Sequence, residues 1–218
     1  MPYPFTSRFS GRLLAIAAAL LLATTAHAVP EAQFQEAVAL FAQAASGDNA
    51  TIDKAADAFT ALLRAEPGNP VLMAYAGAST SRRATTTLLP WKKISYAEDG
   101  MAMIDKALAL LTPANDAAVQ GGTPVALQVR FVAANTFLAV PGFMNRGARG
   151  AKLLTEVLDS PLFAQASLGF QGAVLLRAAK LAQADKRLDD ARKYLGEVIK
   201  RNAPQADAAR AQLAALPS

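Results

Sequence analysis

The chain contains no cysteine and only one histidine, His27, among its 218 residues. Without cysteine it can form no disulfide and offers no thiolate nucleophile or thiolate metal ligand. His27 lies in a segment that we expect to be removed, so the mature protein would lack histidine too. This excludes Cys or His zinc sites, His-ligated haem and the Ser-His and Cys-His catalytic pairings. We therefore expect no enzyme, no metal site and no cofactor.

Residues 1–28 have the three-part pattern of a secretory signal peptide. Arg8 and Arg12 precede an uninterrupted apolar run over residues 13–23, and the small residues Ala26 and Ala28 suit signal peptidase. The run is shorter than the roughly 20 apolar residues that a membrane-spanning helix needs. We expect cleavage after Ala28, a single domain over residues 29–218, and a periplasmic or secreted protein with no stable membrane insertion.

A strong charge of one sign is also missing. The chain has 22 Lys and Arg against 17 Asp and Glu, a formal charge of +5. Arg8 and Arg12 leave with the signal, so the mature balance is +3, which is too mild to indicate nucleic-acid binding. The basic excess lies in the middle of the chain, because residues 81–155 carry nine basic and four acidic side chains.

No stretch shows the alternation typical of strands, whereas apolar residues three and four positions apart recur along nearly the whole mature chain. Over residues 31–45, for example, Phe34, Val38 and Phe41 fall on one helical face. Turn-forming residues follow at 46–49, and Pro67-Gly68-Asn69-Pro70 separates two later helices. The sequence therefore predicts an all-α protein.

Pairs of helices separated by turns indicate a helical-hairpin repeat. Near the C-terminus, Ala179, Ala191 and Val198 stand where the tetratricopeptide repeat has small residues that let two helices approach closely. This segment resembles that family, although Val198 replaces its last small residue. The Pro-Gly-Asn-Pro junction at 67–70, followed by Met73, Ala76 and Gly77, also resembles the start of a tetratricopeptide unit.

The resemblance implies a right-handed solenoid of about four helical hairpins. The units fall at residues 31–68, 69–112, 125–160 and 161–204, and a helix at 205–216 would cap the stack. An irregular helical bundle is the alternative. Members of the family mostly act as scaffolds or adaptors, so the resemblance implies that the partner is another envelope protein or a peptide.

Two of the predicted hairpins have lengthened turns, at residues 81–93 and 141–148. Both occur at the same place within their units, and equivalent turns lie along one edge of a stacked array, so the two segments should be neighbours. They combine cations with large apolar groups, including the only tryptophan. The candidate binding residues there are Arg82, Arg83, Trp91, Lys92, Lys93, Phe143, Asn145, Arg146 and Arg149.

Two interpretations of this edge remain open. In the structural one, side chains such as Trp91 and Phe143 anchor the long turns on the core, and the cations keep them soluble. In the functional one, guanidinium and aromatic groups accept a carboxylate, a phosphate or an acidic peptide. We expect a protein-binding scaffold or adaptor, and the alternative is a periplasmic accessory protein that binds a small anionic ligand and serves a transporter.

Overall fold

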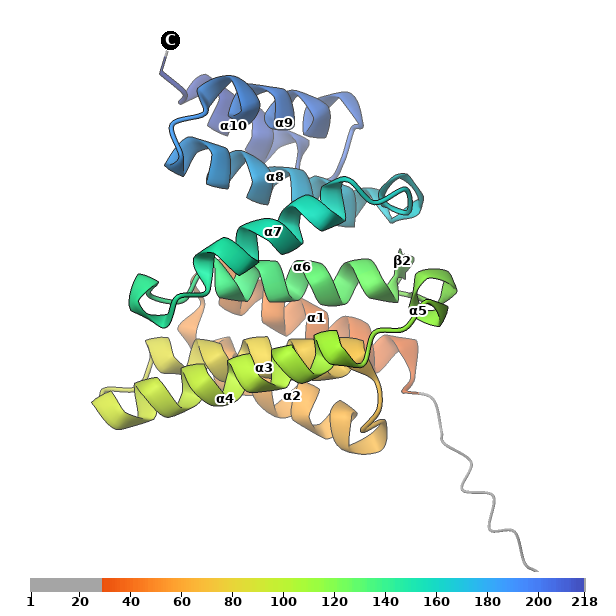
Figure 1. Cartoon of the computed structure of the whole chain (residues 1–218), viewed down its shortest axis with the longest axis vertical. Coiled ribbons are helices and arrows are strands. Elements are labelled where there is room, and N and C mark those ends of the chain that lie inside the picture. Colours follow the sequence, from red (N-terminus) through yellow and green to blue (C-terminus); the bar gives the residue numbers. More distant parts are fainter. Residues whose placement is uncertain (1–28, 218) are drawn as a thin grey trace, which may run out of the picture.

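The computed structural model describes residues 29–217, so the expected signal peptide lies outside the described residues. The described chain is predominantly helical, which confirms the all-α prediction (Figure 1). Its ten α-helices are α1 (Glu31–Ala45), α2 (Ile52–Ala65), α3 (Pro70–Arg82), α4 (Pro90–Ala109), α5 (Ala114–Ala117), α6 (Val125–Phe137), α7 (Gly147–Leu158), α8 (Leu168–Ala184), α9 (Leu188–Lys200) and α10 (Ala206–Ala214). Four 3₁₀ helices join them: η1 (Asn49–Thr51), η2 (Arg83–Thr85), η3 (Gly142–Met144) and η4 (Phe163–Gln165).

Helices that follow one another in the chain pack in pairs. α1 packs on α2, α3 on α4, α6 on α7 and α8 on α9, while α10 packs on α9. Contacts between α3 and α6 and between α7 and α8 join these pairs. The pairs α6–α7 and α8–α9 follow one another along the long axis of the molecule, whereas α1–α2 and α3–α4 lie together at its other end (Figure 1). Nearly all buried side chains are apolar and form a core that runs through the whole stack.

Among residues 29–217, a small hairpin is the one pair of strands. β1 (Val119–Gln120) pairs antiparallel with β2 (Thr123–Pro124). Gly121 and Gly122 form the turn with φ angles of +57° and +70°. Two consecutive positive φ angles are characteristic of the tightest hairpin turns, which glycine adopts without steric cost.

An aromatic cluster holds α1, α2 and α3 together. Phe59 is fully buried and stacks on Tyr75 with ring centres 4.8 Å apart. Phe41 meets Tyr75 edge-on at 5.2 Å, and Phe34 meets it at 6.0 Å. Such aromatic pairs add stability beyond the area they bury. The cluster therefore fixes the position of Phe41, which also lies at the candidate site described below.

The closest helix crossing occurs between Gly77 of α3 and Gly100 of α4. A Cβ atom on Gly77 would lie 2.6 Å from the carbonyl oxygen of Gly100, and one on Gly100 would lie 2.6 Å from the backbone nitrogen of Ser81. Only glycine fits at both positions. This crossing fixes the middle of α4 against the second half of α3.

The limits of three predicted segments, the two long turns and the closing helix, were wrong. α3 continues to Arg82 and α4 begins at Pro90, so residues 90–93 are helical and the connection covers residues 83–89. Proline suits the first turn of a helix because no hydrogen-bonded N–H is lost there. The second predicted turn, 141–148, is partly η3, and α7 already begins at Gly147. The closing helix covers Ala206–Ala214 instead of 205–216, between Pro204 and Pro217.

Candidate functional site: a cationic pocket

The candidate site is a pocket of about 420 Å³ between α1, α3, α6 and α8, to which Ala97 of α4 also contributes. The segments that follow α3 and α6 form its rim. Its lining residues are Phe41, Ala45, Ala78, Ser81, Arg82, Ala84, Thr85, Ala97, Asn135, Thr136, Ala139, Val140, Pro141, Arg177 and Lys180. We call it the cationic pocket, because the lining includes three basic side chains and no carboxylate.

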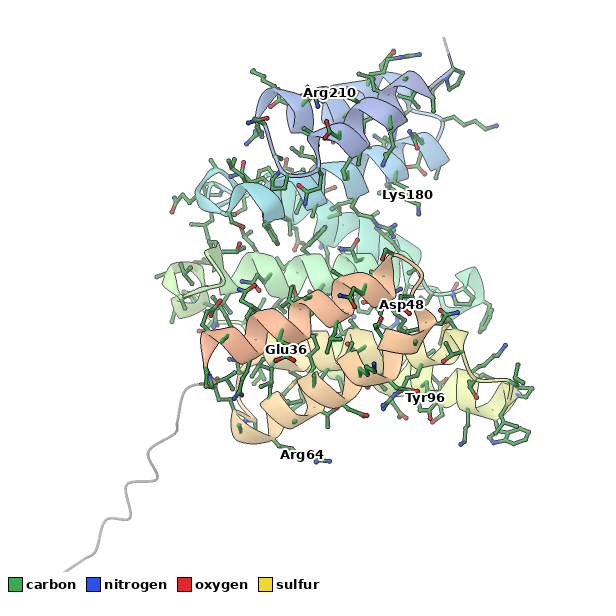
Figure 2. The ribbon with its side chains drawn as sticks, turned by 180° about the vertical axis from the view of Figure 1, so that it is seen from behind. Glu36, Asp48, Arg64, Tyr96, Lys180 and Arg210 are labelled. Carbon is green, nitrogen blue, oxygen red and sulfur yellow. The ribbon has the colours of Figure 1, made fainter. Side chains whose placement is uncertain are left out.

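The three cations come from two helices that are far apart in the sequence. Arg82 ends α3, and its terminal nitrogen donates a hydrogen bond of 3.3 Å to the backbone oxygen of Ala44. Its guanidinium carbon lies 5.6 Å from the centre of the Phe41 ring, within the range of a cation–π contact. Arg177 and Lys180 lie on α8, one turn apart. Figure 2 shows Lys180 extending from α8 on the side of the molecule where α1 ends.

Both arginines have a polar atom that is buried without a partner. The Nε atoms of Arg82 and Arg177 are inaccessible to solvent and make no hydrogen bond with the described residues. Burial lowers the pKa of both guanidinium groups, although an arginine stays protonated at neutral pH. Each side chain is therefore a partly buried positive charge without a compensating carboxylate. An anion bound in the pocket would supply the missing negative charge beside both guanidinium groups.

The rest of the lining suits a small organic molecule. Asn135 and Thr136 of α6 add neutral polar groups, while Phe41, Val140 and several alanines add apolar surface. Small-ligand pockets typically have volumes of roughly 300 to 1,000 Å³ and a mainly apolar wall with a few polar groups. The cationic pocket lies within this range of volumes, but its wall is more polar, with eight apolar and seven polar or charged lining residues.

The two predicted edge segments do lie next to each other, since Thr85 and Pro141 line the same pocket. The nine candidate residues nevertheless separate into three groups. Arg82 is the only one of them that lines the cationic pocket. The other eight belong either to ion pairs and turns or to an exposed helix end.

Arg83 points away from the pocket, toward α2. Its Nε lies 2.7 Å from Asp53 and a terminal nitrogen lies 2.6 Å from Asp57. Both carboxylates are about three-quarters exposed. Solvent-exposed ion pairs of this kind contribute little to stability, because water and salt screen them.

Arg146 and Arg149 share one carboxylate, that of Asp105 on α4. Arg146 lies 3.1 Å from it, and Arg149 also pairs with it. Both guanidinium groups lie over the Phe137 ring, at 5.3 and 5.1 Å from its centre. Asn145 adopts a left-handed conformation, with φ +54°, and its amide donates to the backbone oxygen of Phe143. These three residues therefore have a structural role in the α6–α7 connection, although the structural interpretation expected its cations only to keep it soluble.

The last group is exposed. Trp91, Lys92 and Lys93 lie in the first turn of α4, and Phe143 lies in η3. None of these four side chains is buried. They do not anchor the connections on the core, contrary to the structural interpretation of Trp91 and Phe143.

Sequence reasoning missed Arg177 and Lys180. A signal for Arg177 is present in the sequence, because this residue lies among the buried positions Leu175, Ala178 and Ala179 of one helix. A charged side chain at the edge of an apolar face needs a partner or a function. Nothing in the sequence shows that it faces Arg82.

Removing Arg83 should have a small effect. We expect Arg83→Gln to lower the free energy of unfolding by less than about 1 kcal/mol, and the loss should shrink further at high salt. Anion binding in the cationic pocket should not change. Urea unfolding at two salt concentrations checks the first expectation. A loss of several kcal/mol would show that the pairs with Asp53 and Asp57 are not merely surface contacts.

Within residues 29–217 no group of three or more His, Cys, Asp or Glu side chains is placed to hold a metal ion. No helix in this range is both long and apolar enough to cross a membrane. Comparisons of the chain with protein-family models, with curated proteins and with solved structures found no match.

Proposed function

We propose that the chain is an exported binding protein that holds a small organic anion in the cationic pocket. One observation carries the proposal: Arg82 and Arg177, from distant helices, bring unpartnered buried Nε atoms to one pocket that has no carboxylate in its lining. A protein tolerates such charges poorly unless they have a partner or a function. The predicted small-ligand alternative is thus better supported than the predicted scaffold.

A tetratricopeptide-like solenoid of four hairpins, with α10 as its cap, is the architecture that we propose for this function. Its support is that Ala179, Ala191 and Val198, which the resemblance places at close-packed positions, are fully buried on α8 and α9, and that these two helices pack together. Four of the helices that line the pocket, α1, α3, α6 and α8, are the first members of the four packed pairs, and Ala97 of α4 also contributes to the lining. In a solenoid of hairpins, equivalent helices share one surface, which such proteins use for binding.

The chemistry of the pocket favours a carboxylate or a phosphate. A guanidinium group offers parallel N–H donors that match the two oxygens of either anion. Lys180 at the exposed end of the pocket would attract the ligand without fixing its orientation. A peptide presents the same kind of anion, the carboxylate at its C-terminus. Binding of a peptide in the pocket would support the predicted protein-binding role.

A thermal-shift series on the full chain tests the proposal. The probes are succinate, citrate, inorganic phosphate and a short peptide with a free C-terminus, all at constant ionic strength. A ligand at 100 times its Kd stabilises the folded state by about 2.7 kcal/mol, so we expect at least one probe to give a saturable rise in Tm. An Arg82→Gln/Arg177→Gln variant should lose this rise.

Stabilisation by the peptide alone would favour the scaffold role. Equal, non-saturating shifts from all probes, in the wild type and in the double variant, would reject a specific site in the pocket.

A further inference from the structure

A second surface, distinct from the cationic pocket, lies at the start of α4. We call it the tip and define it as residues 88–94 together with Phe143. Its apolar side chains are unusually exposed: Leu88 is 90% exposed, Phe143 74% and Trp91 66%. Ile94 is half exposed, and it lines the same shallow hollow as Phe143. Several large apolar side chains that are exposed next to one another mark an interaction surface.

The charge of the tip is entirely positive. Lys92 and Lys93 are exposed and form no ion pair with the described residues. No Asp or Glu occurs between residues 84 and 97. The first acid, Glu98, follows Trp91 by about two helical turns and lines the hollow beside Ile94 and Phe143. The tip therefore combines apolar groups with free cations.

The tip also projects from the molecule. In Figure 1 the start of α4 extends beyond the neighbouring helices, and Figure 2 shows the same end of the helix beyond Tyr96. The close contact with α3 occurs at Gly100, in the middle of α4, and the residues of α4 from Pro90 to Ser95 are exposed. A projecting end is poorly shaped to enclose part of another protein, but it can press into a flat, deformable surface.

We propose that the tip docks the protein onto an anionic membrane surface. Leu88, Trp91 and Phe143 would enter the interfacial layer, where tryptophan is favoured because its ring is both apolar and able to donate a hydrogen bond. Lys92 and Lys93 would extend their apolar stems along this layer and place their ammonium groups at lipid phosphates. The contact is peripheral, so it requires no membrane-spanning helix.

The chain provides its own reporter for this contact, because Trp91 is the only tryptophan. The full chain is mixed with vesicles of phosphatidylcholine alone or of phosphatidylcholine with phosphatidylglycerol, with brominated acyl chains in a parallel set. We expect a blue shift of the Trp91 emission and quenching by the brominated lipid, both confined to the anionic vesicles. Quenching reports on the tip itself, whichever other part of the chain touches the vesicle.

Two charge variants provide the matched comparison. Lys92→Gln/Lys93→Gln should weaken binding to anionic vesicles on the order of tenfold, since each lysine near an anionic surface adds to the affinity. Lys106→Gln/Lys193→Gln removes the same charge from two exposed lysines that lie outside the tip and form no ion pair with described residues, and it should bind as the wild type does.

Several results would overturn the proposal. Vesicle binding without quenching would place the contact elsewhere in the chain. Equal quenching by neutral and anionic vesicles would show that Lys92 and Lys93 do not contribute to binding. A blue shift that only a purified protein partner produces, and vesicles never do, would assign the tip to protein binding.

Discussion

An Arg177→Met variant should be at least as stable as the wild type without ligand, while losing most of its anion affinity. Arg177 brings a buried Nε without a partner to the pocket, so its replacement removes a desolvation cost. Methionine keeps much of the apolar stem. We expect the free energy of unfolding to rise by up to about 1 kcal/mol, because apolar replacement of a buried charge is often neutral or stabilising.

The same substitution should weaken binding by about 2 kcal/mol or more, which is roughly 30-fold, because the bound anion would lose a charged partner in a desolvated site. Such opposite effects on stability and binding are typical of residues that are kept for function.

Urea unfolding and calorimetric titration with the best probe measure the two effects of Arg177→Met. The control is Arg210→Met, which removes an exposed arginine paired with the almost fully exposed Asp207 on α10. We expect it to change stability by less than about 0.5 kcal/mol and to leave the affinity unchanged. An Arg177→Met protein that is clearly destabilised but binds normally would make Arg177 a structural residue.

The second prediction with a large effect concerns the stability of the crossing between α3 and α4. Alanine is normally better than glycine inside a helix by about 1 kcal/mol. At Gly100 we expect alanine to be less stable than glycine, because the new Cβ would lie 2.6 Å from the nitrogen and 2.7 Å from the Cβ of Ser81. These neighbours are parts of a packed helix and cannot rotate away. We expect Gly100→Ala to destabilise the protein by about 1 to 3 kcal/mol, the usual cost of overpacking.

Gly196 on α9 offers the matched control, since a Cβ built there would meet nothing within 4 Å. Gly196→Ala should stabilise the protein by about 0.5 to 1 kcal/mol through helix propensity alone. The midpoints of thermal unfolding should therefore move in opposite directions. If both variants were stabilised, α3 and α4 would not cross as closely as described.

The helices were predictable because their signals are local. Apolar periodicity places Phe34 and Phe41 on one face of α1, and the Pro-Gly-Asn-Pro junction ends one helix pair and starts another. The start of α4 was missed although Pro90 marks it. The exposed run Leu88–Leu89–Pro90–Trp91 lacks a buried face and therefore has the pattern of a loop.

The site was harder to predict because its groups meet only in three dimensions. Arg82 was identified within a basic segment, but its companion Arg177 lies in a helix whose small apolar residues indicated packing alone. Arg83, Arg146 and Arg149 looked equally suitable in the sequence. Their carboxylate partners, Asp53, Asp57 and Asp105, lie on other helices, and the sequence does not show which cations they neutralise.

The central claim is that an anion binds in the cationic pocket beside Arg82 and Arg177, whose buried Nε–H groups have no partner among the described residues. The most direct test is a ¹H–¹⁵N NMR spectrum of the arginine Nε–H groups, recorded during titration with the best probe and assigned with Arg82→Lys and Arg177→Lys variants. We predict that these two resonances shift together and saturate, while those of Arg83 and Arg210 stay in place. Saturable binding that leaves both pocket resonances unchanged would contradict the account.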